Sequence, residues 1–243
     1  MKKNLISIIT PTHNRSDFLR QNIISLQKQK EDGFEHEHII VDNDSTDNTA
    51  EMVAEMAKED PRIIYIKNNR NIGPGDALNI GFARSNGDLI VPADDDDLFP
   101  LSSLQFRFNF MTKNPDIDWS YGHSIFIDEN NKLWKDLLEY RTTRDEKSTL
   151  LETLLVRCFV SGGTVTIRRN CIEKVSGWTV ERPLQDYDMW LRLANADCKL
   201  GHIDSYLYYY RIHQGQITNF HKKENTYIKE AEYYRNFYKN SKK

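Results

Sequence analysis

The chain has 243 residues, of which 33 are Lys or Arg and 36 are Asp or Glu, so its formal net charge is -3 at pH 7. This near-balance excludes a nucleic-acid binder that relies on nonspecific attraction to phosphates. With 39% hydrophobic and 28% charged residues, the chain can bury a sizeable core, which excludes a disordered protein.

The first apolar run, Leu5 to Ile9, imitates the start of a signal peptide. Ser7 and Pro11 interrupt it well short of the roughly 18 residues needed to span a bilayer. We interpret it as the first strand. No other stretch has the composition of a membrane span, so we expect a soluble protein or one attached peripherally to a membrane.

The cysteines are odd in number and show no C-x-x-C spacing: Cys158, Cys171 and Cys198. This pattern argues against both a disulfide framework and a structural zinc site. It favours a protein that works in the reducing cytoplasm.

Short apolar runs alternate with stretches of helical spacing along the first hundred residues. Strands are predicted over 6–10, 37–41, 62–66 and 88–91, and helices over 16–28, 50–58 and 77–85. Beyond Pro100 the pattern is less regular, with strands predicted over 119–127 and 164–167, a charged loop over 128–147, and helices over 150–158 and 186–195. The alternation predicts an α/β fold whose mostly parallel, Rossmann-like sheet is flanked by helices.

No linker rich in Pro, Gly or Ser divides the chain, so we expect a single domain followed by a C-terminal helix over 221–243. This tail holds seven Lys or Arg against three Glu, and it gathers Tyr227, Ala231, Tyr234 and Phe237 or Tyr238 on one side. Three interpretations remain open for the tail: it lies on an acidic membrane surface, pairs with another chain, or contacts the core.

Polar residues follow three of the predicted strands, in the loops Thr12–Arg15, Asp42–Asp44 and Asp94–Asp97. The carboxyl ends of parallel strands meet at one edge of a sheet, where α/β proteins bind their ligands. We therefore expect the three loops to face one crevice.

Four consecutive aspartates, Asp94 to Asp97, follow the fourth predicted strand. Their mutual repulsion is costly unless a cation offsets it, and a hard divalent ion such as Mg²⁺ or Mn²⁺ takes oxygen ligands. Because such ions are commonly held by one or two carboxylates together with substrate phosphates, the run suggests a ligand that contains a diphosphate. A solvated acidic turn is the alternative interpretation.

The order of these segments resembles the family 2 glycosyltransferases, which have the GT-A fold. The resemblance is carried by Ile8-Ile-Thr-Pro-Thr-His-Asn-Arg15, Val41-Asp-Asn-Asp-Ser-Thr-Asp47, Asn71-x-Gly73, Ala77-x-Asn79-x-Gly81 and Gly87-Asp-Leu-Ile before Asp94-x-Asp96. It implies a catalytic domain over 1–220, with a nucleotide-sugar-binding half over 1–100 and an acceptor-binding half over 101–220.

The resemblance also implies roles for single residues. The family's metal-binding D-x-D element falls on Asp94–Asp96, so Asp94 and Asp96 would bind the cation, with His213 as a further ligand, and Asp95 would contact the donor ribose. The remaining donor contacts would come from Pro11, His13, Arg15, Asp42, Asn43 and Asn71.

Two positions depart from the family pattern. Asn43 stands where the family commonly has an aspartate, and its amide oxygen is a weaker acceptor for the N3–H of uracil, so uridine, guanine and thymine donors all stay open. Leu78 stands where many members carry a basic residue, which leaves Arg15 or Arg70 to contact the pyrophosphate.

The segment Pro183-Leu-Gln-Asp-Tyr-Asp-Met-Trp-Leu-Arg192 resembles the family's E-D-x-D-x-x-x-R element, which assigns the catalytic base to Asp186. The free N–H groups at a helix start favour a charged carboxylate there, as a base requires. The alternative is that Asp186 only caps the helix. Asp188 points about 200° away around the helix, so we interpret it as structural.

The resemblance thus predicts a metal-dependent, inverting glycosyltransferase that uses a nucleoside-diphosphate sugar, foremost a UDP-sugar. The acceptor would be a hydroxyl of a saccharide or lipid-linked molecule, in bacterial surface polysaccharide synthesis, in the cytoplasm or at the inner face of the membrane. Two alternatives are a sugar nucleotidyltransferase, whose Gly-rich first loop is not matched by Pro11–Asn14, and a catalytically silent sugar- or metal-binding module, which would not need Asp186.

Overall fold

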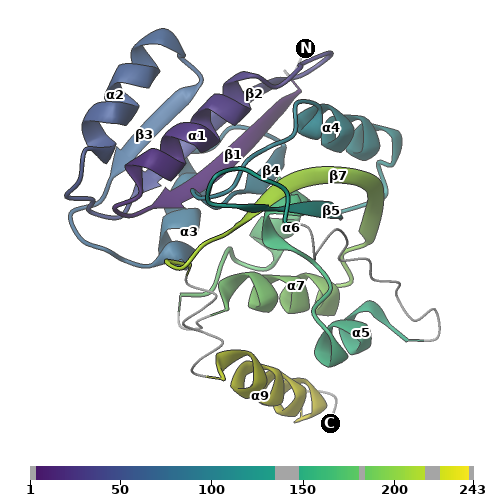
Figure 1. Ribbon diagram of the computed structural model, residues 1–243. Helices are drawn as coiled ribbons and strands as arrows, with labels where there is room; N and C mark the ends of the chain where they lie inside the picture. Colours follow the sequence, from purple (N-terminus) through teal and green to yellow (C-terminus); the bar gives the residue numbers. More distant parts are fainter. Residues whose placement is uncertain (1–3, 135–147, 181–183, 217–224, 241–243) are drawn as a thin grey trace.

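The computed structural model describes residues 4–134, 148–180, 184–216 and 225–240 (Figure 1). In the first half of the chain, strands and helices alternate as the sequence predicts. These elements are β1 (Leu5–Thr12), α1 (Ser16–Gln27), β2 (Glu35–Asp42), α2 (Thr49–Glu59), β3 (Ile63–Lys67), α3 (Pro74–Arg84) and β4 (Leu89–Pro92).

The second half is less regular. It contains α4 (Ser103–Lys113), β5 (Trp119–Asp128), α5 (Leu150–Val156), the 3₁₀ turn η1 (Gly162–Thr164), β6 (Thr166–Arg168), α6 (Arg169–Lys174), α7 (Gln185–Asn195), β7 (Leu200–Ile212) and α9 (Thr226–Asn240). Four of these elements, α4, η1, α6 and β7, are additional to those that the sequence pattern predicts.

The strands form one seven-stranded sheet in the order β3-β2-β1-β4-β6-β5-β7. Strands β1 to β4 run parallel, and β5 pairs with β7 in parallel, whereas the short β6 is antiparallel to both of its neighbours. The predicted α/β fold with a mostly parallel sheet flanked by helices is confirmed.

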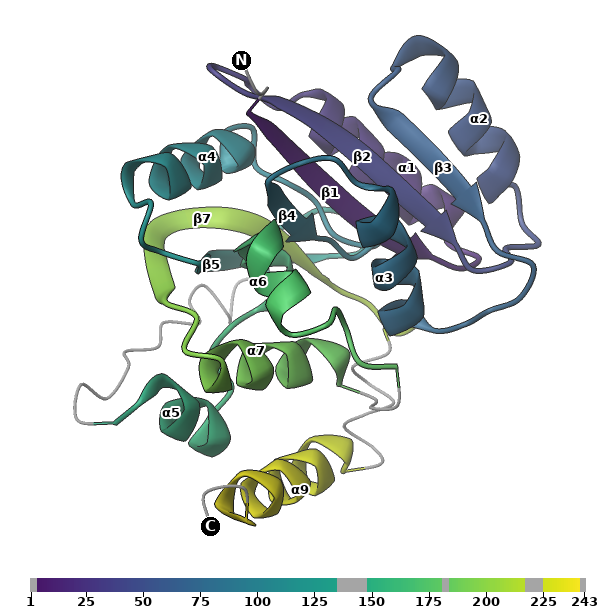
Figure 2. The same cartoon turned by 180° about the vertical axis from the view of Figure 1, so that it is seen from behind.

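Helices cover both faces of the sheet, with α1, α2 and α4 on one side (Figure 1) and α3, α6 and α7 on the other (Figure 2). This explains why β1 has apolar side chains on both of its faces. Ile6 and Ile8 contact the first layer of helices, whereas Ile9 contacts the second. A parallel strand that is buried on both faces needs apolar side chains in both directions.

Two local predictions differ from the structure. The strand predicted over 164–167 begins at Thr166, because η1 occupies the residues before it. The charged loop predicted over 128–147 begins inside β5, which ends at Asp128, and its residues 135–147 lie outside the described part of the chain.

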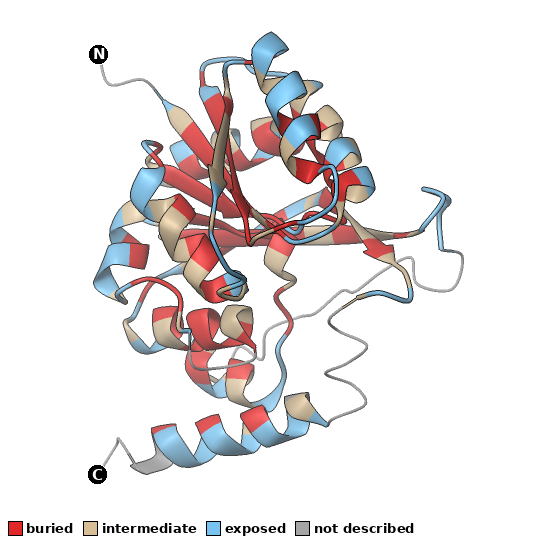
Figure 3. Ribbon diagram, turned by 90° about the vertical axis from the view of Figure 1, so that its left-hand side faces the viewer, coloured by how far each residue is buried: buried red, intermediate tan, exposed pale blue. Residues whose placement is uncertain are grey.

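The C-terminal helix α9 contacts α5 and α7, so one of the three interpretations of the tail is observed (Figure 3). Tyr234 and Tyr238 are buried in the core, whereas Phe237 is exposed. The Tyr234 hydroxyl donates to Asp188 at 2.6 Å, and Arg192 donates to the other oxygen of this carboxylate at 2.6 Å. Asp188 is therefore structural, as its position on the helix predicts.

Among the described residues, no helix combines the length and the apolar composition that a membrane crossing requires.

Arg107 of α4 is fully buried, and no acidic side chain pairs with it in the described part of the chain. Burial lowers the pKa of its guanidinium to about 9. The donors are satisfied by main-chain carbonyls and two hydroxyls, from Gly163, Thr164, Val165, Leu207, Ser103 and Thr166. One side chain thus fastens η1 and its neighbours to α4 and β7.

We expect Arg107→Met to destabilise the protein by at least about 2 kcal/mol, since several buried carbonyls lose a donor at about 1–3 kcal/mol each. Urea unfolding of the two proteins measures the difference. Arg20→Met, at an exposed position of α1, is the control and should change the free energy of unfolding by less than about 0.5 kcal/mol. Equal losses in both variants would contradict the role given to Arg107.

Candidate functional site

A cavity of about 790 Å³ opens at the carboxyl ends of β1, β2 and β4. Most of the residues that the sequence singles out line it: Pro11, His13, Arg15, Asn43, Asn71, Asp94, Asp95, Asp96 and Asp186. The three polar loops thus face one crevice, as predicted. Asp42, His213 and Arg70 are not among the lining residues.

The backbone of the Asp94–Asp97 segment, which we call the acid loop, is held by polar groups from distant elements. Asn22 of α1 donates to the carbonyls of Asp94 and Asp97, and the Tyr208 hydroxyl accepts from the N–H of Asp94. The Arg211 side chain of β7 donates to the carbonyl of Asp96, and the Arg211 backbone N–H donates to the carboxylate of Asp97. The acid loop is therefore a fixed part of the fold, unlike a solvated acidic turn.

The side chains of the acid loop surround a cationic group. The guanidinium of Arg15 donates to Asp95 at 3.1 Å and to Asp96 at 2.5 Å, and a third bond joins it to the carbonyl of Gly215. His213 contacts the same oxygen of Asp96 as Arg15 does, with its Nε2 at 3.0 Å from Oδ2. Thr12 donates to the second oxygen of Asp95 at 2.7 Å.

Crowding of carboxylates and loss of water shift the pKa values at this edge of the sheet. Desolvation, followed by the charge of Asp96, raises the pKa of Asp95 to about 6. The side chain of Asp94 is exposed within the cavity, yet desolvation by the surrounding protein and the charges of Asp96 and Asp186 raise its pKa. The acid loop would bind a cation with favourable electrostatics, because positive charge offsets this repulsion.

The neighbouring end of the cavity is formed by the loops after β1 and β2. The His13 ring contacts the carbonyl of Asn43 at 2.7 Å through Nδ1. The Asn43 amide donates to the carbonyl of Gly73 and accepts from Asn68 at 2.9 Å. An amide oxygen has two lone pairs, so Asn43 can still accept a second hydrogen bond from a ligand.

Asp42 lies apart from this group. Its side chain is fully buried, and its carboxylate accepts from the N–H of Ser45 at 2.8 Å and from the hydroxyl of Tyr65. The Asp42 carboxylate therefore stabilises the loop that follows β2 and links it to Tyr65 of β3. Asn71 lines the cavity and accepts from the N–H of Gly73 at 3.0 Å.

Asp186 is the second residue of α7 and is half-buried in the wall of the cavity opposite the acid loop. Desolvation raises its pKa to about 6. A Cβ added to Gly162 would lie 2.3 Å from Oδ2 of Asp186, so a side chain at this position would displace the carboxylate. Gly162 belongs to η1, the turn that Arg107 fastens.

The sequence analysis did not assign several lining residues to the site, among them Thr12, Leu184, Tyr187, Tyr210 and Gln216. Thr12 belongs to the first of the polar loops that were expected at the crevice, and Leu184 and Tyr187 lie inside the segment that resembles the E-D-x-D-x-x-x-R element. Tyr187 also donates to the carbonyl of Leu154 at 2.9 Å, which binds α7 to α5. Trp190 stacks on Trp119 in the core with ring centroids 5.3 Å apart.

Comparison with known proteins identifies the fold and the family. The structure is similar to S. aureus TarS in complex with UDP-GlcNAc, with a TM-score of 0.69 and 19% identity over 87% of this chain and 59% of that one. An uncharacterized glycosyltransferase of Methanocaldococcus jannaschii is 30% identical over 215 residues, which cover 87% of this chain and 72% of that protein.

The third similar protein is UDP-Glc:alpha-D-GlcNAc-diphosphoundecaprenol beta-1,3-glucosyltransferase WfgD of Escherichia coli. It is 28% identical over 193 residues, or 79% of this chain and 71% of that protein. The chain thus spans about three fifths of the solved TarS chain and about seven tenths of the two relatives.

The fold is therefore GT-A, and the class of protein is a glycosyltransferase. Residues 7–176 match the sequence profile of Glycosyl transferase family 2, and the chain belongs to that family. The resemblance found in the sequence motifs is confirmed, and family membership decides against the nucleotidyltransferase alternative.

The resemblance assigns Asp186 the role of base. We therefore expect Gly162→Ala to lower kcat of glycosyl transfer by about 10- to 100-fold, because a methyl group would displace this carboxylate and small misplacements of a catalytic group are costly. The temperature of unfolding should change little. Gly215→Ala is the control, because Gly215 is not a lining residue of the cavity and its added Cβ would meet only the His213 ring, at 3.5 Å. Similar kcat losses in both variants would show that Gly162 has no special relation to Asp186.

Proposed function

We propose that this protein transfers a sugar from a nucleoside-diphosphate donor, foremost a UDP-sugar, to a hydroxyl group of a saccharide or lipid-linked acceptor, with inversion at the anomeric carbon. The catalytic domain would be residues 1–220, with the donor bound by residues 1–100 and the acceptor bound by residues 101–220. One observation carries the proposal: the acid loop and Asp186 open into the same cavity from different elements.

The base of the donor would lie between the loops that follow β1 and β2. Pro11 and His13 offer a surface for its flat face, and Asn43 offers the remaining lone pair of its amide oxygen for an N–H at its edge. UDP is the first choice because WfgD and TarS are named with UDP-sugars. Asp42, which is engaged by Tyr65 and Ser45, would support the loop instead of touching the base.

Carboxylates and an imidazole fit Mn²⁺ or Mg²⁺ in chemical kind, and we propose that Asp94, Asp96 and His213 hold such an ion. When bound, the ion would supply positive charge that stabilises the leaving diphosphate. Asp94, Asp96 and His213 do not form a compact ligand group in this structure. In the described part of the chain, the three ligand-type side chains whose atoms lie within 4.8 Å of one another are Asp118, Cys171 and Cys198. In this structure Asp96 is engaged by the guanidinium of Arg15, which also donates to Asp95.

Arg15 would therefore exchange partners when the donor binds. Its guanidinium carries several donors in a planar fork, which suits the oxygens of a diphosphate as well as those of carboxylates. It would leave Asp96 for the diphosphate and so provide the contact that a basic residue at position 78 provides in many relatives.

Asp186 would accept the proton of the acceptor hydroxyl. The acceptor oxygen forms a bond to the anomeric carbon, while the bond from that carbon to the diphosphate oxygen breaks and its electron pair leaves with the diphosphate. One displacement of this kind inverts the configuration. The raised pKa of Asp186, about 6, suits a base that works near neutral pH.

The acceptor side is proposed from the relatives. WfgD is named for an acceptor linked to diphosphoundecaprenol, so we propose a lipid-linked or saccharide acceptor in surface polysaccharide synthesis, used at the cytoplasmic face of a membrane. Contact of α9 with a membrane, or with a second copy of the chain, would then involve the residues of α9 that face away from the core, such as Ile228 and Lys229.

A thermal-shift panel of UDP, GDP, TDP and CDP, each with and without Mn²⁺, tests the donor site. We expect UDP with Mn²⁺ to stabilise the protein most, since a ligand at 100 times its dissociation constant adds about 2.7 kcal/mol. If no nucleotide stabilises the protein in a metal-dependent way, the proposed donor site is wrong.

The same panel with Arg15→Ala tests the exchange of partners. This variant should gain stability from Mn²⁺ alone, because the competing cation is gone, and should gain less from UDP with Mn²⁺ than the wild type does. Arg70→Ala, outside the cavity, is the control and should behave as the wild type.

We expect Asp186→Asn to reduce kcat by about 10²- to 10⁴-fold, the usual contribution of a general base, while donor binding persists. In the wild type, kcat/KM should fall about tenfold per pH unit below about pH 6, because protonation of Asp186 removes the base, and it should level off at higher pH. The residual activity of Asp186→Asn should lack this fall.

Asp188→Asn provides a matched control on the same helix. Its carboxylate contacts Arg192 and Tyr234, so the substitution should lower stability and leave the pH profile unchanged. An Asp186→Asn enzyme with full activity would refute the assignment of the base.

A further inference from the structure

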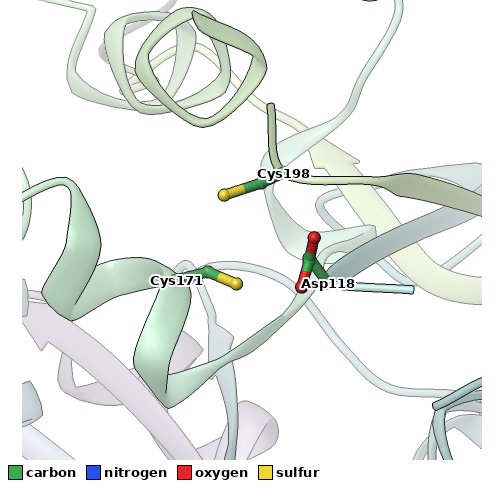
Figure 4. Close-up of side chains that lie close together, drawn as sticks. All are labelled: Asp118, Cys171 and Cys198. Carbon is green, nitrogen blue, oxygen red and sulfur yellow. The ribbon is translucent and has the colours of Figure 1, made fainter. Parts of the chain in front are cut away.

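A second group of ligand-type side chains lies at the edge of the sheet opposite the cavity. Asp118 precedes β5, Cys171 belongs to α6, and Cys198 lies between α7 and β7. One ligand atom from each residue lies within 4.8 Å of the other two. Figure 4 shows the two thiols and the carboxylate directed toward the same space.

The position of this group separates it from the acid loop. Asp118 accepts from the N–H of Arg168, which is paired with Leu89 at the start of β4, whereas the acid loop follows the end of that strand. Asp186 is near the beginning of α7 and Cys198 follows its end. At a rise of about 1.5 Å per residue, the helix from Asp186 to Asn195 spans about 13 Å.

The surroundings hold the three side chains in place. Cys171 and Cys198 are 3% and 4% exposed, and Asp118 is half-buried. The backbone N–H of Lys199 donates to Oδ2 of Asp118 at 2.7 Å, an outer hydrogen bond of the kind that orients ligating carboxylates. Among the described residues, no Lys or Arg side chain forms an ion pair with Asp118.

The chemistry of the group favours a borderline-soft metal ion. Zn²⁺ is bound in proteins by Cys sulfur, His nitrogen and carboxylate oxygen, and its sites contain four ligands in a tetrahedral arrangement. Two thiolates and one carboxylate provide three of these, and the partial exposure of Asp118 admits water as the fourth. A disulfide between the two cysteines would not explain why the carboxylate of Asp118 lies within 4.8 Å of both sulfur atoms.

We propose that Asp118, Cys171 and Cys198 form a zinc-binding site. Burial raises the pKa of both thiols, so each carries its proton in the metal-free protein. Binding of the ion replaces two S–H bonds with two S–Zn bonds and releases two protons. The ion clips α6 and the end of α7 to the start of β5, and so anchors the helix that carries Asp186.

The spacing of these cysteines in the chain gives no sequence signal for the site. Sequence patterns for zinc rely on close pairs such as C-x-x-C, whereas here each ligand comes from a separate element. The sequence argument against structural zinc is valid for those patterns only.

Metal analysis of the full chain tests the proposal. The protein is equilibrated with Zn²⁺ in excess Mg²⁺, which occupies oxygen-ligand sites, and then desalted. We expect one zinc per chain, two protons released per zinc bound, and a higher temperature of unfolding. Co²⁺ in place of Zn²⁺ should show a near-ultraviolet thiolate-to-metal charge-transfer band.

The chain contains its own matched control. Cys171→Ser and Cys198→Ser should lose the zinc and the cobalt band, and Asp118→Asn should weaken zinc binding by more than about tenfold. Cys158→Ser, which changes the exposed third cysteine, should retain both signals. If a cysteine variant fails to fold, the cobalt band of the wild type and the Asp118→Asn titration decide the question.

Three results would overturn the proposal. The first is a wild-type protein that retains no zinc, and the second is zinc retained equally by Cys171→Ser. The third is a Cys171–Cys198 disulfide formed under peroxide in a protein that does not bind zinc when reduced.

Discussion

The mutual repulsion of four adjacent aspartates is the constraint on which the site depends. The acid loop at the end of β4 concentrates negative charge where the protein excludes much of the water, and that charge must be offset. Arg15 comes to it from the loop after β1, Arg211 from β7 and Asn22 from α1. Because these groups are distant in sequence, the hydrogen bonds that they donate to the acid loop also join the two halves of the sheet and shape the cavity between them.

The other wall of the cavity depends on a buried cation without an acidic partner. Arg107 directs its donors at the carbonyls around η1, and η1 carries the glycine that leaves space for the Asp186 carboxylate. A contact in the core thus determines the position of the proposed base. The two charged centres have different partners. The carboxylates of the acid loop bind a guanidinium, whereas the guanidinium of Arg107 binds neutral carbonyls of the turn next to Asp186.

The first half of the fold could be predicted closely because each signal there is local. Short runs that contain consecutive apolar residues form β1 to β4, and polar loops follow β1, β2 and β4. In the second half, local signals conflict with tertiary contacts. The alternation of Phe106, Phe108 and Phe110 is typical of a strand, yet α4 is a helix because Leu104, Arg107 and Met111 are buried at helical spacing. The sequence offers no sign that a buried position would be filled by arginine.

The sequence by itself determined which polar segments follow which strands, and motif order was enough to place most of the proposed site residues around one cavity. Only the tertiary structure decided that Asp42 turns toward Tyr65, that His213 reaches Asp96, and that Cys171 meets Cys198. The physical reason is that periodicity and polarity encode local structure and burial. Contacts between side chains tens of residues apart depend instead on how strands pair and how helices cover them.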